Sequence, residues 1–129
     1  MSDKVIQNWL KLAEYDFATA KAMLQTGRYL YVVFTCQQTI EKMLKAIYVK
    51  EKGETPPYSH NLLKLITHWS YYPNVEEKRI RFLEMLNSFY IESRYSEEIR
   101  ELSRIVSKRK AEEILKKTEG LFSWLKKKI

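Results

Sequence analysis

The chain has 129 residues, of which 45% are hydrophobic and 30% charged, and this length suits one folded domain, residues 1–129, with its own core. Three glycines and three prolines are too few for an all-β fold or for disorder, and the formal net charge is +7. A single cysteine, Cys36, excludes an intrachain disulfide, and no apolar run is long enough for a membrane span, so we expect a reduced, cytoplasmic protein.

The first two predicted helices form an antiparallel hairpin. Apolar residues at the helical period predict a first helix from an N-cap at Asp3 to about residue 26, with Gly27 just past its end. Asp16 lies at the rim of its apolar stripe. A second helix is predicted over residues 28–52 and ends at Gly53. The short link between the two helices favours antiparallel packing.

Two further helices are expected after a turn-rich loop, GETPPYSH. Ser59 is a candidate cap for a short third helix over residues 60–70, because the two prolines before it cannot continue a helix. Asn74 is a candidate cap for a fourth helix that runs from residue 75 to about residue 95.

The last part of the chain is basic. Residues 96–106 fit either a helix or a loop, and Ser107 is predicted to cap a final helix to Leu125. From Arg104 onward nine Lys and Arg stand against three Glu. Such a surface attracts acidic partners or nucleic acid, although a solvated helix face gives the same pattern. The elements together predict an all-α, up-and-down bundle of four to five helices.

A block of polar residues shares one face of the second helix: Gln38, Glu41, Lys42 and Lys45. The simplest interpretation is a solvated side with a favourable Glu41–Lys45 pair. However, Tyr31, Phe34 and Thr35 lie on the same face one or two turns earlier. A helix that is apolar nearly all round is covered on both sides, either centrally in a bundle or at a subunit interface. The polar block is then expected at the edge of a covered surface.

A second polar strip is predicted on the fourth helix: Asn87, Tyr90 and Arg94, followed at once by Tyr95. An arginine at the rim of a bundle can hold a phosphate with two parallel hydrogen bonds. The alternative is a structural ion pair of Arg94 with Glu41 or with Asp16.

The two histidines have different expected roles. His60, at the start of the third helix, either satisfies a nearby carboxylate or serves as a distant general base, whereas His68 is expected in packing or at the surface. Two separated histidines without a cysteine or a tight carboxylate cluster make a poor metal site, so we predict no metal.

Several motifs occur together along the chain: W-x3-A-x2-D-F at 9–17, QQTIEKMLKA at 37–46, SHNLLKL at 59–65, SRY at 93–95 and AEEILKKTEGLFSWLK at 111–126. In their order and spacing they resemble the HEPN domain, and the resemblance covers nearly the whole chain. It implies a helical bundle that usually forms a homodimer. The polar block of the second helix then corresponds to a family signature.

The resemblance also implies a functional context. Family members are often encoded beside a minimal nucleotidyltransferase and bind it, in some cases as a toxin–antitoxin pair. Many are metal-independent ribonucleases in which an arginine is followed, after four to six residues, by a histidine. Arg94 matches this arginine only through SRY, and Ile99, Arg100 and Glu101 occupy the histidine positions. The ribonuclease motif is therefore absent, and no catalytic residue is assigned.

From these features we expect a non-catalytic HEPN-type subunit that forms a homodimer, binds a minimal nucleotidyltransferase and holds a nucleotide such as ATP, with no required cofactor. The candidate ligand-binding residues are Asp16, Gln38, Glu41, Lys42, Lys45, His60, Asn87, Tyr90, Arg94 and Tyr95. The alternative is a metal-independent ribonuclease with a diverged site that uses Arg94 with His60 or Tyr95. A plain RNA-binding domain is a third hypothesis, but few aromatic residues alternate with the basic ones.

Overall fold

The computed structural model describes residues 3–90 and 94–129, and this part of the chain contains six α-helices, one 3₁₀ turn and no strand. The elements are α1 Asp3–Gln25, α2 Tyr29–Lys52, α3 Leu62–Ile66, the 3₁₀ turn η1 Tyr72–Asn74, α4 Glu77–Asn87, α5 Ser96–Ile105 and α6 Lys108–Lys128. The predicted all-α fold is confirmed. The additional helix is α5, in the segment whose conformation the sequence left open.

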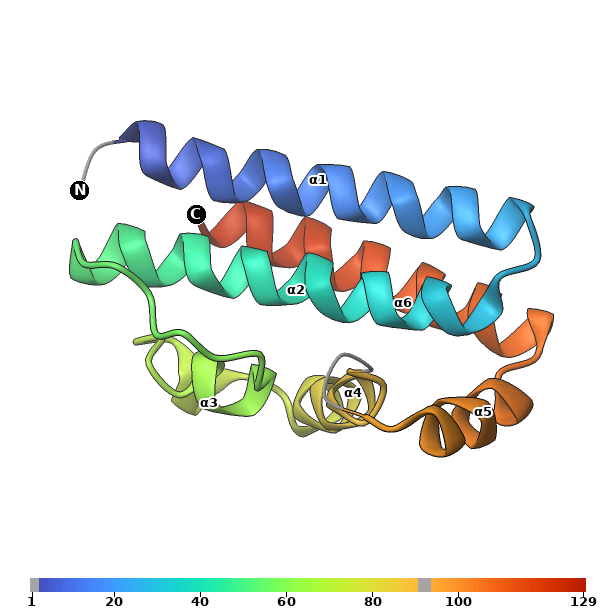
Figure 1. The fold of residues 1–129 in the computed structure, drawn as a ribbon. Helices are drawn as coiled ribbons and strands as arrows, with labels where there is room; N and C mark the ends of the chain where they lie inside the picture. Colours follow the sequence, from blue (N-terminus) through green and yellow to red (C-terminus); the bar gives the residue numbers. More distant parts are fainter. Residues whose placement is uncertain (1–2, 91–93) are drawn as a thin grey trace.

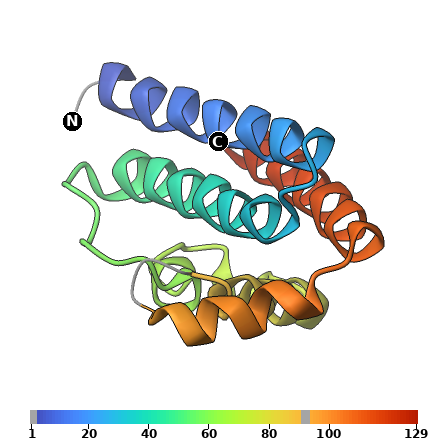
Figure 2. The same cartoon turned by 45° about the vertical axis from the view of Figure 1, so that its right-hand side comes forward.

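The helices form two layers around α2. The long helices α1, α2 and α6 pack side by side, and the shorter helices α3, α4 and α5 lie along the other side of α2 (Figures 1 and 2). Because α2 contacts all five other α-helices, its residues are buried on nearly every side, including Val32, Cys36 and Ile40. The predicted two-sided cover of α2 is therefore confirmed, and the cover comes from within the same chain.

The ends of the first two helices depend on glycine in the left-handed region. Gly27 has a φ of 76° and Gly53 a φ of 66°, a conformation that side-chain-bearing residues avoid. Both predicted helix ends are confirmed. Asp3 is itself the first helical residue of α1, rather than the N-cap that we predicted.

The third helix is shorter than predicted. Asn61, not Ser59, caps α3, because its Oδ1 accepts hydrogen bonds from the backbone N–H groups of Leu63 and Lys64 at 3.0 and 3.3 Å. Ser59 instead accepts a hydrogen bond on its Oγ from the N–H of Asn61 at 3.1 Å. The helix therefore begins at Leu62, and residues 54–61 cross the surface of α2 as a loop.

The predicted fourth helix is wrong at both ends. Asn74 ends the 3₁₀ turn and α4 begins only at Glu77. α4 stops at Asn87. There Ser88 Oγ donates a hydrogen bond to the Met85 carbonyl at 2.6 Å, whereas in a longer helix this carbonyl would accept a backbone N–H. The part of the prediction over 91–93, including the first residue of SRY, falls outside the described residues.

The last helix confirms its predicted start. Ser107 Oγ accepts a hydrogen bond from the N–H of Lys110 at 3.1 Å, and α6 continues to Lys128, three residues beyond the predicted end. Its buried face packs on α2 and α1. Among the described residues, no helix is long and apolar enough to cross a membrane.

Candidate functional site

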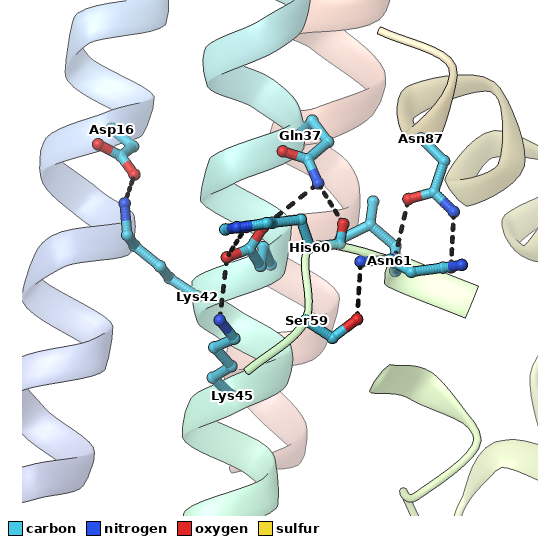
Figure 3. Close-up of polar contacts among 10 residues, drawn as sticks. Asp16, Gln37, Lys42, Lys45, Ser59, His60, Asn61 and Asn87 are labelled. Atoms are coloured by element: carbon cyan, nitrogen blue, oxygen red, sulfur yellow. Dashed lines mark hydrogen bonds and ion pairs between the residues drawn. The ribbon is translucent and has the colours of Figure 1, made fainter. Parts of the chain in front are cut away.

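Three polar side chains are buried along one face of α2. Gln37, Glu41 and Lys45 follow one another at intervals of four residues, and their exposed fractions are 0%, 6% and 6%. Glu41 and Lys45 belong to the predicted polar block, and their burial excludes the solvated-face interpretation. The loop before α3 covers them (Figure 3). A buried charge is costly unless it is paired, so the contacts of these residues decide what the site can do.

Glu41 lies between a lysine and a histidine. Its Oε2 pairs with Lys45 Nζ at 3.1 Å, and its two carboxylate oxygens lie 3.0 and 3.2 Å from His60 Nδ1. Because a carboxylate only accepts hydrogen bonds, Nδ1 carries the proton and donates to Glu41. Among the described residues, no hydrogen bond engages Nε2, and the His60 side chain is 39% exposed. The expected role of His60 with a nearby carboxylate is thus confirmed, and its Nε2 is available to a ligand.

Gln37 fixes the loop that carries His60. Its Nε2 donates a hydrogen bond to the His60 carbonyl at 2.7 Å and lies 3.4 Å from Glu41 Oε1 (Figure 3). Both neighbours are acceptors, so only one orientation of the amide is compatible with them. The backbone and the ring of His60 are therefore both held by α2.

Asn87 joins the end of α4 to the start of α3. Its Oδ1 accepts a hydrogen bond from the Leu62 N–H at 2.8 Å, and its Nδ2 donates to Asn61 Oδ1 at 2.9 Å. This side chain positions the helices around the site, and its polar atoms are largely used in doing so.

Tyr90 and Arg94 complete an opening next to His60. The Tyr90 ring stacks on the His60 ring, with centroids 4.4 Å apart and planes at 18°. A cleft of about 320 Å³ is lined by His60, Asn61, Asn87, Tyr90 and Arg94. We call this opening the His60 cleft. It brings an imidazole, an aromatic ring and a guanidinium to one place.

The alternative of a structural ion pair for Arg94 is confirmed, but the partner is neither Glu41 nor Asp16. Arg94 Nη1 pairs with Oε2 of Glu98, in the first turn of α5, at 3.1 Å, and Nη2 donates to the Ser88 carbonyl at 2.6 Å. A guanidinium has five N–H donors, so these two bonds hold it in place, and among the described residues its remaining Nη donors have no hydrogen-bond partner.

The remaining candidate residues lie outside the His60 cleft. Asp16 and Lys42 form an ion pair that joins α1 to α2 (Figure 3). Gln38 is half-buried on α2, and Tyr95 is 81% exposed at the start of α5. The structure therefore brings together Glu41, Lys45, His60, Asn87, Tyr90 and Arg94, and separates the other four from them.

Sequence reasoning missed several residues of the site. Gln37 stands one helical interval before Glu41, so its position on the same face was readable from the sequence. Asn61 and the exposed Tyr58, whose ring lies 5.8 Å from that of His60, gave no periodic signal because they belong to a loop. In the described part of the chain, no group of three His, Cys, Asp or Glu could hold a metal ion.

Comparison with known proteins agrees with the fold. The family model of the HEPN domain matches residues 6–129. The chain therefore belongs to the HEPN domain family, a class of helical domains associated with nucleotide binding and ribonuclease activity.

A solved structure supports the same architecture. The crystal structure of TT1696 from Thermus thermophilus superposes with a TM-score of 0.81 over 96% of this chain and 98% of that chain. The two sequences are 23% identical, so this likeness concerns the fold alone. A search of curated protein sequences found no match.

Proposed function

We propose that this chain is a non-catalytic HEPN-type subunit that binds the phosphates of a nucleotide such as ATP in the His60 cleft. The proposal includes a homodimer and a minimal nucleotidyltransferase as partner, as in a toxin–antitoxin module. No further cofactor is needed for this role. The observation that carries the proposal is that His60, Tyr90 and Arg94 line one cleft.

The chemistry of the cleft suits a nucleotide. Arg94 offers N–H donors to a phosphate, and His60 Nε2 offers a further polar contact. Aromatic rings give a base a surface for stacking, and Tyr58 and Tyr90 flank the His60 ring. Since Ile99, Arg100 and Glu101 occupy the positions of the family histidine, the ribonuclease motif cannot form on α5.

A homodimer is supported by family membership and by exposed apolar surface. Tyr31, at the start of α2, is 45% exposed, and Ile105, at the end of α5, is 56% exposed. Large apolar side chains at the surface are candidates for an interface. Light scattering at micromolar concentration should give the mass of two chains, and the mass of one chain would contradict the dimer.

The nucleotide is tested by thermal unfolding with and without saturating ATP, ADP, GTP or a short RNA. A ligand at one hundred times its Kd stabilises a protein by about 2.7 kcal/mol, which raises Tm by several degrees. We expect this rise with a nucleotide in wild type and its loss in Arg94→Ala. The matched control is Arg100→Ala, which removes an exposed arginine from α5 outside the cleft. No rise with any nucleotide would contradict the proposal.

The partner is tested by co-expressing this chain with any minimal nucleotidyltransferase found in a neighbouring gene. We expect the two proteins to purify together through size-exclusion chromatography. Separate elution at micromolar concentration would contradict this part of the proposal while leaving the nucleotide result intact.

A second candidate function is a metal-independent ribonuclease with a diverged site. It is favoured by the contact of His60 Nδ1 with Glu41, which orients the imidazole as a general base in the same cleft as Arg94. RNA incubated with the protein in a chelating buffer should then be cut by wild type and not by His60→Ala or Arg94→Ala. Intact RNA with wild type would exclude this function.

A further inference from the structure

A second opening lies between α4 and α6, and of its described lining residues none is shared with the His60 cleft. Its volume is about 560 Å³. The lining residues are Lys78, Arg79, Arg81, Phe82 and Met85 of α4 and Lys117, Gly120 and Leu121 of α6. We call it the α4/α6 groove. α4 packs mainly on α2 and α3, and the groove lies between α4 and α6.

The groove has an apolar floor and a cationic rim. Phe82 and Met85 are half-buried and Leu121 is buried, so the floor resembles the edge of the core. Four of the described lining residues are cationic and none is acidic. An apolar surface bordered by one sign of charge favours a ligand with an apolar side and the opposite charge.

The acidic neighbours of the groove neutralise this rim only in part. Arg81 Nη2 pairs with Glu77 at 2.9 Å, and Glu76 lies 3.7 Å from Lys78 Nζ and 3.9 Å from Arg79 Nε. The side chains of both glutamates are mostly exposed, and such pairs are weak. On the opposite wall, Lys117 has no ion-pair partner among the residues that the structure describes. The rim therefore remains positive on both helices.

No contact within the described part of the chain accounts for a glycine at position 120. It lies in the interior of α6, where glycine is less stable than alanine because it loses more conformational freedom on folding. Its φ is not positive, and an added Cβ would meet no atom of the described residues within 4 Å. Neither the backbone nor internal packing requires a glycine at this position. A glycine leaves room for another chain to approach the helix backbone closely.

We propose that the α4/α6 groove binds an acidic amphipathic helix of a partner protein. Such a helix lays its apolar face on Phe82, Met85 and Leu121, in the way that helices commonly bind grooves between other helices. Its carboxylates face the three cations of the α4 wall and Lys117 of the α6 wall, and one of its turns approaches the α6 backbone at Gly120.

The arrangement favours a helix over other ligands. A nucleic acid would satisfy the cations through its phosphates but would leave the apolar floor uncovered. A small amphiphile with one charged group would match cations gathered at one point, whereas these cations come from both walls. The guanidinium of Arg79 stacks on Trp124, with its carbon 4.1 Å from the ring centroid, and this contact orients the side chain at the rim. The inference adds a protein-binding surface to the nucleotide cleft and does not depend on it.

The probe is a fluorescein-labelled acidic peptide of about five helical turns, with leucines along one face and glutamates on the other. Its binding to the full chain is followed by fluorescence anisotropy. We expect Gly120→Phe, which fills the groove, and Lys117→Glu, which reverses a rim charge, each to weaken binding at least about tenfold. The matched control Lys127→Glu makes the same charge change on α6 outside the groove and should alter binding less than about twofold.

Further controls separate the possible ligands. A peptide of the same composition with its apolar stripe scrambled should not bind, and Arg94→Ala should bind like wild type, because Arg94 does not line the α4/α6 groove. Circular dichroism checks that each variant is folded, and if Gly120→Phe is not, Lys117→Glu decides. No peptide binding, or equal binding by wild type and Lys117→Glu, overturns the proposal. Binding of dodecanoate or single-stranded RNA, but not of the peptide, also overturns it.

Discussion

The two openings of this molecule are built in opposite ways. In the His60 cleft, the polar groups behind the surface are buried and paired with one another, above all Glu41 with Lys45 and His60. In the α4/α6 groove, the charges are exposed or weakly paired and lie over an apolar floor. Substitutions of the buried polar residues behind the cleft should therefore mainly lower folding stability. Changes at the groove should affect binding and leave the fold intact.

The largest effect is expected at Glu41. Glu41→Gln leaves the ammonium group of Lys45 buried without its counter-charge, which should lower the free energy of unfolding by about 3 kcal/mol. Urea denaturation measures this loss. Glu84→Gln, the same change at an exposed position of α4, should stay within about 0.5 kcal/mol of wild type. Equal stabilities of the two variants would show that the buried pair does not support the cleft.

Asn87 should have the next largest effect. Asn87→Ala removes the acceptor of the Leu62 N–H and the donor to Asn61, which should cost about 2 kcal/mol. The Leu62 amide should also exchange with solvent faster. Asn8→Ala, at an exposed position of α1, is the control. An unchanged exchange rate at Leu62 would contradict this role of Asn87.

The buried thiol of Cys36 gives a pH dependence that belongs to neither opening. Burial raises the pKa of Cys36 from 9.0 to about 12. Above pH 9 the unfolded chain loses this proton while the folded chain keeps it, so stability falls as pH rises towards 12. At pH 10 this contribution is on the order of 1 kcal/mol. The fall in stability between pH 8 and pH 10 should be smaller by about this amount in Cys36→Ala, and identical pH profiles would contradict it.

The smallest effect is expected at Gly120 and has the opposite sign. Gly120→Ala should raise the free energy of unfolding by about 0.5–1 kcal/mol, because the helix interior favours alanine and the added Cβ meets nothing. Gly27→Ala is the matched control, since the φ of 76° at Gly27 makes the same change destabilising. Thermal unfolding compares the two. A destabilised Gly120→Ala would mean that the fold itself requires this glycine.

The parts of the structure that follow a helical period were predictable from the sequence. The burial of α2 on both sides follows from its apolar residues, and the Ser107 cap follows from local chemistry. The contacts that make the site could not be predicted, because Gln37 reaches a carbonyl 23 residues away and Asn87 reaches an asparagine 26 residues away. These contacts depend on how the loop before α3 lies across α2.

The Arg94–Glu98 pair shows that a contact between residues close in the sequence can also escape prediction. Its spacing of four residues is that of a helical ion pair, whereas the sequence predicts Arg94 near the end of the fourth helix, which separates it from Glu98. In the structure Arg94 precedes α5 and lines the His60 cleft, and it pairs with Glu98 rather than with Glu41 of α2 or Asp16 of α1. An error in one helix boundary thus became an error in the partner of a candidate site residue.

The most direct test of the His60 cleft as a nucleotide site is an NMR titration of the two histidine rings with ATP. His60 lines the cleft, whereas His68 is exposed beside Tyr48 and serves as an internal control. We predict that the ring signals of His60 shift and saturate, that those of His68 stay in place, and that Arg94→Ala abolishes the shift. Unmoved signals of both rings, or equal shifts in wild type and Arg94→Ala, would contradict a nucleotide site at the His60 cleft.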